Sequence, residues 1–282
     1  NVSKDDCSSQ CLVDYVCGNN IKESGEECDD GNTNNGDGCT SQCLVESGGV
    51  QPEPNGVNKS RYISFIPGMP GQQTALRVTL TSLHHPNPPY GIGKASDFSA
   101  FEGQVRWVGP SAVYRESQSD SRTFKAAQLQ CEPYYTDWGS VGLIHVTGAE
   151  IVPSSNYSVQ MINQGCSITN PSCYSPSLMV KTTRWGDIAS PFNPPSPTTQ
   201  PDTIDTAQLV NKFKNVIGAP LKVQAKLQPN IINLSVEINA FDIVSIVDAV
   251  KGLPYPYSGP VNCGASASAV IPLCTNECSL IG

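Results

Sequence analysis

The hydrophobic and polar positions in the middle of the chain alternate over short stretches, which is the pattern of half-buried β-strands. In "TALRVTLTSL" (residues 74–83), Leu76, Val78 and Leu80 point to one face and the residues between them to the other. Similar runs follow one another, and Gly, Pro, Asn or Ser separates most of them. Short strands with such punctuation predict a β-sandwich over residues 56–185.

Two of these runs, "EIVPSSNYSVQMI" (residues 150–162) and "SPSLMVKTT" (residues 175–183), resemble the last two strands of a fibronectin type III or immunoglobulin-like domain. Pro153 interrupts the loop and Tyr157 opens the next strand. The resemblance implies a tyrosine corner, in which the Tyr157 hydroxyl folds back onto the backbone.

The pattern changes after the Pro-rich spacer "SPFNPPSPTTQP" (residues 190–201), which we expect to be extended. Two segments then show helical spacing, "DTAQLVNKFKNVIG" and "AFDIVSIVDAVKG". We expect Asp205 to cap the first helix, and Gly218 and Gly252 to end the two helices. The residues predicted to form the packing stripes are Leu209, Val210, Phe213 and Val216 in the first helix, and Ile243, Ile246, Val247 and Val250 in the second.

The composition suits a mainly β protein outside the cell. Among 282 residues, 15% are charged, and there are 24 glycines and 23 prolines. The net charge of −8 argues against a nucleic-acid partner. No apolar run is long enough for a transmembrane segment.

The twelve cysteines crowd toward both ends of the chain. Their clustering in segments with few apolar residues predicts disulfides and an oxidising, extracellular location, whereas zinc sites would need CxxC pairs or more histidines. For the central cysteines, two pairings stay open: Cys166 with Cys173, or Cys131 with Cys166. The full set of predicted disulfide cysteines is Cys7, Cys11, Cys17, Cys28, Cys39, Cys43, Cys131, Cys166, Cys173, Cys263, Cys274 and Cys278.

Four N-x-Ser triplets are candidate glycosylation sites, although an Asn- and Ser-rich chain also produces such triplets by chance. They begin at Asn1, Asn58, Asn156 and Asn233.

The segment "CGNNIKESGEECDDGNTNNGDGCTSQC" (residues 17–43) resembles the Myxococcus cysteine-rich repeat, a short disulfide-bonded module of secreted bacterial proteins. An earlier CxxxC pair reads as the end of a partial first repeat, so we assign residues 1–48 to this module. Its polar side chains either bind calcium or form Asx-turns with their own backbone. The candidate calcium ligands here are Asp29, Asp30, Asn32, Asn34 and Asp37.

The two helical segments resemble a dockerin type I repeat pair, which would bind calcium in EF-hand-like loops. On this resemblance, residues 186–262 form a small helical domain with a Pro-rich insertion, followed by a cysteine-containing tail at 263–282. The implied ligands are Asp187, Asp202, Asp205, Asn239 and Asp242. Gln208 and Lys226 depart from the pattern, and lost carboxylates lower calcium affinity, so at most one site is expected.

The catalytic motifs that we sought are missing from the sequence: it contains no Gly-x-Ser-x-Gly elbow, HExxH or phosphate loop. His84 and His85 lie adjacent in a Pro-rich segment, which reads as surface. The aromatic run "CEPYYTDWG" (residues 131–139) could stack on sugar, but packing is the favoured interpretation.

Three functions remain. The favoured one is a non-catalytic secreted structural or adhesion protein that forms homo-oligomers or a polymer, with a filament or surface layer as the expected assembly. The order of modules resembles secreted surface proteins of planctomycete-type bacteria and supports this location. The alternative is a dockerin-like module that binds an extracellular protein partner. A polysaccharide-active enzyme using Glu102, Glu132 or Asp137 ranks last.

Overall fold

The structure is a computed structural model. It describes residues 16–19, 33, 41–43, 49–53, 59–68, 70–83, 101–190, 201–229, 232–257, 259–260 and 262–263. Most of the expected cysteine-rich module and of the C-terminal tail lies outside these residues. Six of the predicted disulfide cysteines also lie outside the described residues, namely Cys7, Cys11, Cys28, Cys39, Cys274 and Cys278.

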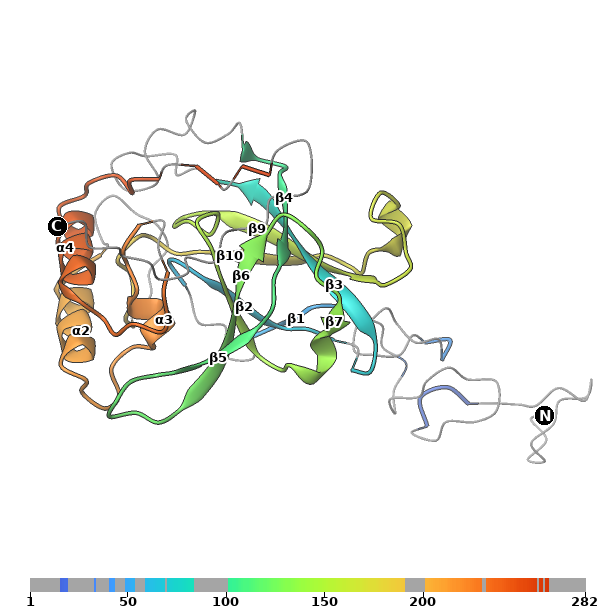
Figure 1. The fold of residues 1–282 in the computed structure, drawn as a ribbon, viewed down its shortest axis with the longest axis horizontal. Coiled ribbons are helices and arrows are strands. Elements are labelled where there is room, and N and C mark those ends of the chain that lie inside the picture. The colour runs from blue at the N-terminus through green and yellow to red at the C-terminus, as the bar shows by residue number, and fades with distance from the viewer. Residues whose placement is uncertain are drawn as a thin grey trace, which may run out of the picture.

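The described part of the chain is mainly β, as predicted, with one sheet of ten strands and a few helices beside it (Figure 1). The strands are β1 (Gln51–Pro52), β2 (Ile63–Ile66), β3 (Gln73–Ser82), β4 (Val105–Val108), β5 (Ala112–Arg115), β6 (Thr123–Gln130), β7 (Thr136–Asp137), β8 (Ile144–Thr147), β9 (Asn156–Asn163) and β10 (Leu178–Lys181). Two short 3-10 turns are η2 (Trp138–Ser140) and η3 (Pro171–Cys173).

The sheet runs in the order β1-β2-β8-β6-β4-β3-β9-β10, with β5 also on β6 and β7 also on β3. β6 joins two halves: its first residues pair with β5 and its last two with β4. On its other edge β6 pairs with β8 in parallel, from Lys125 opposite Ile144 to Gln128 opposite Thr147. This parallel pair departs from the antiparallel sheets of an immunoglobulin-type sandwich.

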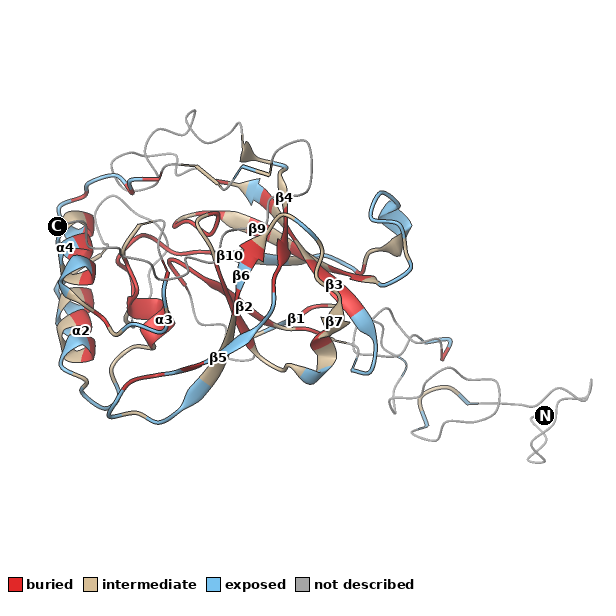
Figure 2. Cartoon of the chain, in the orientation of Figure 1, coloured by how far each residue is buried: buried red, intermediate tan, exposed pale blue. Residues whose placement is uncertain are grey.

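The alternation read in the sequence is confirmed in β3. Leu76, Val78 and Leu80 are completely buried and belong to the main hydrophobic core. That core also holds Phe65 from β2 and Val146 from β8, so it lies between the two halves of the sheet. Figure 2 shows the buried stretches of these strands in red.

The tyrosine corner predicted at Tyr157 is present. The Tyr157 hydroxyl accepts a hydrogen bond from the Val152 N–H at 2.8 Å and donates to the Glu150 carbonyl at 3.0 Å. The buried phenol thus satisfies two backbone groups of the loop that precedes its own strand.

The C-terminal helices are α2 (Thr203–Phe213), α3 (Lys222–Ala225) and α4 (Ala240–Val250). They pack beside the sheet (Figure 1) and share its core, to which Leu209, Leu227 and Ile246 belong. We call residues 187–190 and 201–257 together the tail, as distinct from the cysteine-containing segment at 263–282. A second, smaller cluster brings Val223 of α3 against Tyr62 and Tyr114. None of the described helices has the length and hydrophobicity needed to cross a membrane.

The helix caps and buried faces differ from the prediction. Asp202, and not Asp205, caps α2, and α2 ends at Phe213, before Gly218. The predicted stripes are partly exposed: Phe213 is 48% exposed, Val216 49%, Val247 39% and Val250 44%. Each helix instead buries one carboxylate and the residues that share its face. These residues are Asp205, Leu209 and Lys212 in α2, and Asp242, Ser245, Ile246 and Ala249 in α4. Gly252, at φ 73°, follows the end of α4 as expected.

Three disulfides join described cysteines. Cys166 pairs with Cys173, which confirms the first of the two pairings considered. Cys131 pairs with Cys263 across 132 residues, so the alternative of Cys131 with Cys166 was wrong. Cys17 pairs with Cys43 in the N-terminal segment.

Candidate functional site

The tail contains the same hydrogen-bonded motif twice. The Asp205 carboxylate accepts the backbone N–H groups of Ile188 and Ala189, both at 2.9 Å, and that of Asp202 at 3.0 Å. In the second motif, Asp242 accepts the N–H groups of three residues placed in the same way, Leu227 at 3.0 Å, Gln228 at 3.3 Å and Asn239 at 3.1 Å. Each carboxylate therefore ties a helix start to the segment that precedes it.

The two motifs differ in the charge beside the carboxylate. Lys226 precedes Leu227, and its Nζ lies 3.4 Å from Asp242 Oδ2. The corresponding residue before Ile188 is Asp187, which is also completely buried. Burial, followed by the negative charge of Asp205, raises the pKa of Asp187 to about 8. The first motif thus holds a second acid where the second motif holds an ammonium group.

These motifs account for five of the calcium ligands predicted from the sequence. Asp187, Asp202 and Asp205 gather at the first motif, and their charges raise the pKa of Asp187. Asp202 caps α2 by accepting the N–H groups of Ile204 and Asp205. In the second motif, Asn239 caps α4 and Asp242 faces Lys226. Among the described residues, no group of three or more His, Cys, Asp or Glu side chains is arranged to hold a metal ion. The other predicted ligands, Asp29, Asp30, Asn32, Asn34 and Asp37, lie outside the described residues.

A buried carboxylate beside the sheet forms polar contacts with the tail. Glu116, which follows β5 and is completely buried, forms an ion pair with Lys212 of α2. The same carboxylate oxygen accepts the backbone N–H of Lys222 at the start of α3. Lys222 Nζ in turn lies 3.1 Å from Glu237. One side chain of the sheet therefore contacts two separate helices of the tail.

Arg61 makes a second polar connection between the sheet and the tail. Its guanidinium donates to the Gln228 carbonyl and to the Tyr255 hydroxyl, and lies 5.0 Å from the centre of the Tyr255 ring. Trp185 packs edge-on against the same ring and donates from Nε1 to the Leu227 carbonyl at 3.0 Å. Arg61 is completely buried, and these contacts replace water at Nη1, whereas Nε and Nη2 have no hydrogen-bond partner among the described residues.

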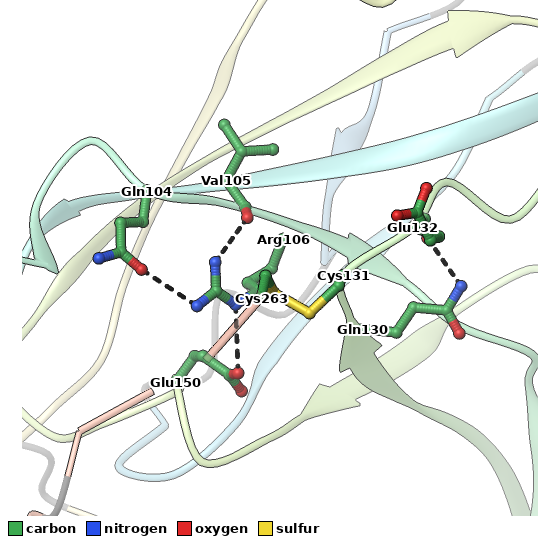
Figure 3. The surroundings of a disulfide bond; sticks show 8 residues. All are labelled: Gln104, Val105, Arg106, Gln130, Cys131, Glu132, Glu150 and Cys263. Atoms are coloured by element: carbon green, nitrogen blue, oxygen red, sulfur yellow. Dashed lines mark hydrogen bonds and ion pairs between the residues drawn. A yellow bond between two sulfur atoms is a disulfide. The ribbon is translucent and has the colours of Figure 1, made fainter. Parts of the chain in front are cut away.

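A disulfide links the end of β6 to a residue that follows the tail. Cys131, just after β6, is bonded to Cys263, which follows the tail (Figure 3). Close to the disulfide, Arg106 Nε lies 3.3 Å from Glu150 in a buried ion pair, and Arg106 also donates to Gln104 and to the Val105 carbonyl. Cys263 is thus covalently held beside the end of β6.

His145 lies buried on β8, on the sheet face that the tail covers. Its Nδ1 is 2.7 Å from the Tyr114 hydroxyl, and Tyr62 packs edge-on against its ring. Its Nε2 is buried without a hydrogen-bond partner among the described residues. Burial, assisted by the positive charge of Lys59, lowers the pKa of His145 to about 4, although Glu53 acts in the opposite direction. The imidazole is therefore neutral at physiological pH.

A cavity of about 400 Å³ lies at the rim of the covered face. Residues of β5 and β6 form one wall, and the turn at residues 232–235 of the tail forms the other. We call this cavity the rim groove. Sequence reasoning missed it, because its walls are separated by about a hundred residues and no local pattern marks them.

The remaining residues that the sequence suggested for sugar binding, catalysis or glycosylation mostly make contacts within the fold or lie outside the described residues. In the aromatic run, Trp138 is completely buried and donates to the Tyr134 carbonyl, so packing is confirmed for this residue, while Tyr134 and Tyr135 are half-buried. Asp137 caps η2 and Glu102 accepts the Leu83 N–H, while Glu132 binds Gln130 through its backbone carbonyl. His84 and His85 lie outside the described residues, as do the glycosylation candidates Asn1 and Asn58. Asn156 begins β9, and Asn233 lies exposed in the tail.

The comparisons with known proteins give no relative: no family model, curated protein or solved structure matches the chain. The function must therefore be inferred from the geometry described above.

Proposed function

We propose that the chain is a non-catalytic secreted structural or adhesion protein of a bacterial cell surface or extracellular matrix. The main support for this proposal is that the buried carboxylates bind backbone groups of the protein itself. Glu116, Asp205 and Asp242 each accept backbone N–H groups from another segment, so they join parts of the fold and are not available to a substrate. Such a framework favours a rigid protein over one with a reactive centre.

The disulfides support an extracellular location, since disulfides persist in oxidising compartments. The Cys131–Cys263 bond joins two distant parts of the chain, and Cys166–Cys173 closes a short loop after β9. We also infer that the central sheet is a variant of the immunoglobulin or fibronectin type III sandwich and that the tail is a degenerate dockerin-like pair. The tyrosine corner supports the first inference, and the repeated aspartate motif supports the second.

Assembly into a homo-oligomer, filament or layer is part of the proposal. It is tested by size-exclusion chromatography with light scattering on unreduced protein isolated from its natural source, first in calcium and then in a chelator. Species much larger than 30.0 kDa support a structural subunit. A monomer in both buffers contradicts assembly and leaves adhesion as the role to test.

Calcium is proposed as an accessory that stabilises the first motif of the tail. What supports this proposal is the buried pair of acids: burial and the negative charge of Asp205 raise the pKa of Asp187, although the hydrogen bond to Thr183 and the positive charge of Arg184 lower it. When bound, calcium would neutralise these carboxylates. The second motif does not suit a cation, because Lys226 already places a positive charge beside Asp242.

The substitution Asp187→Lys tests the calcium proposal, since it copies the Lys226 arrangement into the first motif. We expect calcium to raise the melting temperature of the wild-type protein by several degrees and to have little effect on the variant. We also expect the variant to melt above the wild-type protein in chelator. Equal melting of the wild-type protein with and without calcium would contradict the proposal.

A dockerin-like binding module is the second candidate, and the outer face of α4 favours it. Phe241 is 65% exposed, Val244 56% and Val247 39%, so the helix presents apolar side chains to solvent as such a module would. The test compares the wild-type protein with Val244→Glu as bait in the native extracellular fraction, followed by reconstitution with the purified partner. A partner that binds both baits equally would contradict a role for this face.

A further inference from the structure

The rim groove has the size and position of a small-molecule site. Its volume of about 400 Å³ lies in the range of about 300–1,000 Å³ found for ligand pockets. It forms where the tail overhangs the outer face of the sheet, and the Glu116 contacts fix the tail relative to that face. Both walls are therefore already in place without a ligand.

The wall formed by the sheet offers carbon surface. Val113 is 66% exposed although it lies within β5, and it lines the groove beside Tyr114. Tyr114 is only 7% exposed, because its hydroxyl is bound to His145 and its ring packs against Tyr62 and Phe124, so little of it is left for a ligand. The exposed carbon surface of this wall is that of Ala112 and Val113, and it suits the C–H face of a ligand.

The polar groups that line the groove are neutral amides and hydroxyls. Gln128 is exposed, and its Nε2 reaches the Ile232 carbonyl only at 3.4 Å, a long contact that a ligand hydroxyl can replace. Asn233 is oriented by the hydrogen bond that its Oδ1 accepts from the Ser235 N–H at 2.9 Å. The described lining residues include no Asp, Glu, Lys, Arg or His.

These properties select the class of ligand. An ion would lose water in the groove without meeting an opposite charge, which is costly. A hydrocarbon would remove water from the exposed amides of Gln128 and Asn233 without replacing its hydrogen bonds. A molecule with hydroxyl groups and C–H faces satisfies both walls.

We propose that the rim groove binds a neutral saccharide unit. The proposal deepens the adhesion role proposed above and rests on it, because it names the class of surface to which the protein would attach. The saccharide has two sources: a free or polymeric glycan, or a sugar attached to Asn233, whose triplet Asn233-Leu234-Ser235 fits the N-glycosylation pattern.

The experiment uses the full chain, secreted with its disulfides formed, from a host that does not glycosylate it. It is applied to an array of neutral and acidic oligosaccharides, and each glycan that binds is then titrated by calorimetry. The variant Val113→Arg places a charge in the groove, while Met179→Arg is the matched control. Met179 is likewise an exposed apolar residue of a strand, 53% exposed on β10 at the other end of the sheet.

We expect a neutral glycan to bind, Val113→Arg to weaken binding at least tenfold, and Met179→Arg to leave it unchanged. Absence of binding to every neutral glycan, binding to acidic glycans alone, or equal binding by Val113→Arg would each overturn the proposal. Peptide mapping of the protein from its natural source distinguishes the two sources: a hexose-containing adduct at Asn233 identifies the attached sugar as the occupant, and an unmodified Asn233 identifies a free glycan.

Assay of the bound glycan for new reducing ends separates this proposal from the non-catalytic role. Cleavage would overturn the non-catalytic function while the groove remained a saccharide site. Lack of binding would overturn the groove proposal while the structural function remained open to the assembly test.

Discussion

Lys226 and Asp187 take equivalent positions in the two motifs of the tail. Each directly precedes the pair of backbone N–H groups that bind the buried aspartate of a helix, Asp242 in one case and Asp205 in the other. The second motif therefore balances its buried carboxylate with a side chain of the same chain, whereas the first brings two acids together. The two halves of the tail share their hydrogen bonds but differ in their electrostatics.

The substitution Lys226→Met is expected to destabilise the protein by about 3–5 kcal/mol, because it leaves the charge of Asp242 buried without its partner. Lys226 also donates to the Glu237 carbonyl at 2.8 Å, and this bond is lost as well. Urea unfolding of the wild-type protein and the variant measures the difference. Lys251→Met, at an exposed lysine just after α4, is the control and should change stability by less than about 0.5 kcal/mol. Similar effects of the two substitutions would refute the role given to Lys226.

Loss of the Cys131–Cys263 disulfide is expected to cost more than loss of Cys166–Cys173. The first bond spans 132 residues and the second 7. In the chain-entropy model, these loops correspond to about 5 and about 2.5 kcal/mol. Cys131→Ser/Cys263→Ser and Cys166→Ser/Cys173→Ser are the matched double variants, compared by denaturant unfolding. If the short-loop variant proved the less stable one, the longer bond would not be the main covalent brace of the tail.

Acid should destabilise the protein through His145. The pKa of this residue in the folded protein is about 4, against an ordinary value of 6.5, so the unfolded chain takes up the proton first as the pH falls. The contribution of neutral His145 to the free energy of unfolding is complete above about pH 6.5 and is lost progressively as the pH falls toward 4. The loss amounts to about 3 kcal/mol.

Unfolding curves measured from pH 7.5 down to pH 4 test this expectation. His145→Gln keeps a neutral polar side chain at the position and should remove this part of the pH dependence. Carboxylates titrate in both proteins, so the difference between the two curves is the informative quantity. Parallel curves would mean that His145 is not the group responsible.

Local patterns in the sequence predicted the features that depend on local physics. The period of two in β3 placed Leu76, Val78 and Leu80 in the core, because alternate side chains of a strand face opposite sides. The pairing of Cys166 with Cys173 was one of two that the sequence left open, and the corner at Tyr157 was implied by the resemblance to a fibronectin type III-like domain.

The features that sequence reasoning missed depend on segments that meet only in the folded chain. The rotation of α2 and α4 is set by the burial of Asp205 and Asp242, and that burial is favourable only because backbone N–H groups from preceding segments bind the carboxylates. The pairing of Cys131 with Cys263 and the rim groove likewise join parts of the chain that no periodicity connects. Lys226 was visible as a departure from the repeat, but its pairing with Asp242 was not.

The substitution Tyr157→Phe is expected to destabilise the protein by about 1–3 kcal/mol. It removes the hydroxyl that serves the Val152 N–H and the Glu150 carbonyl, and both groups lie in a completely buried corner where water cannot replace it. Tyr174→Phe is the matched control, because the Tyr174 hydroxyl also donates to a backbone carbonyl, that of Ile168 at 2.7 Å, but at an exposed position. Thermal and urea unfolding of the two variants should therefore separate them, with Tyr174→Phe close to the wild-type protein. Equal stability of the two variants would show that the corner contributes no more than an exposed hydrogen bond.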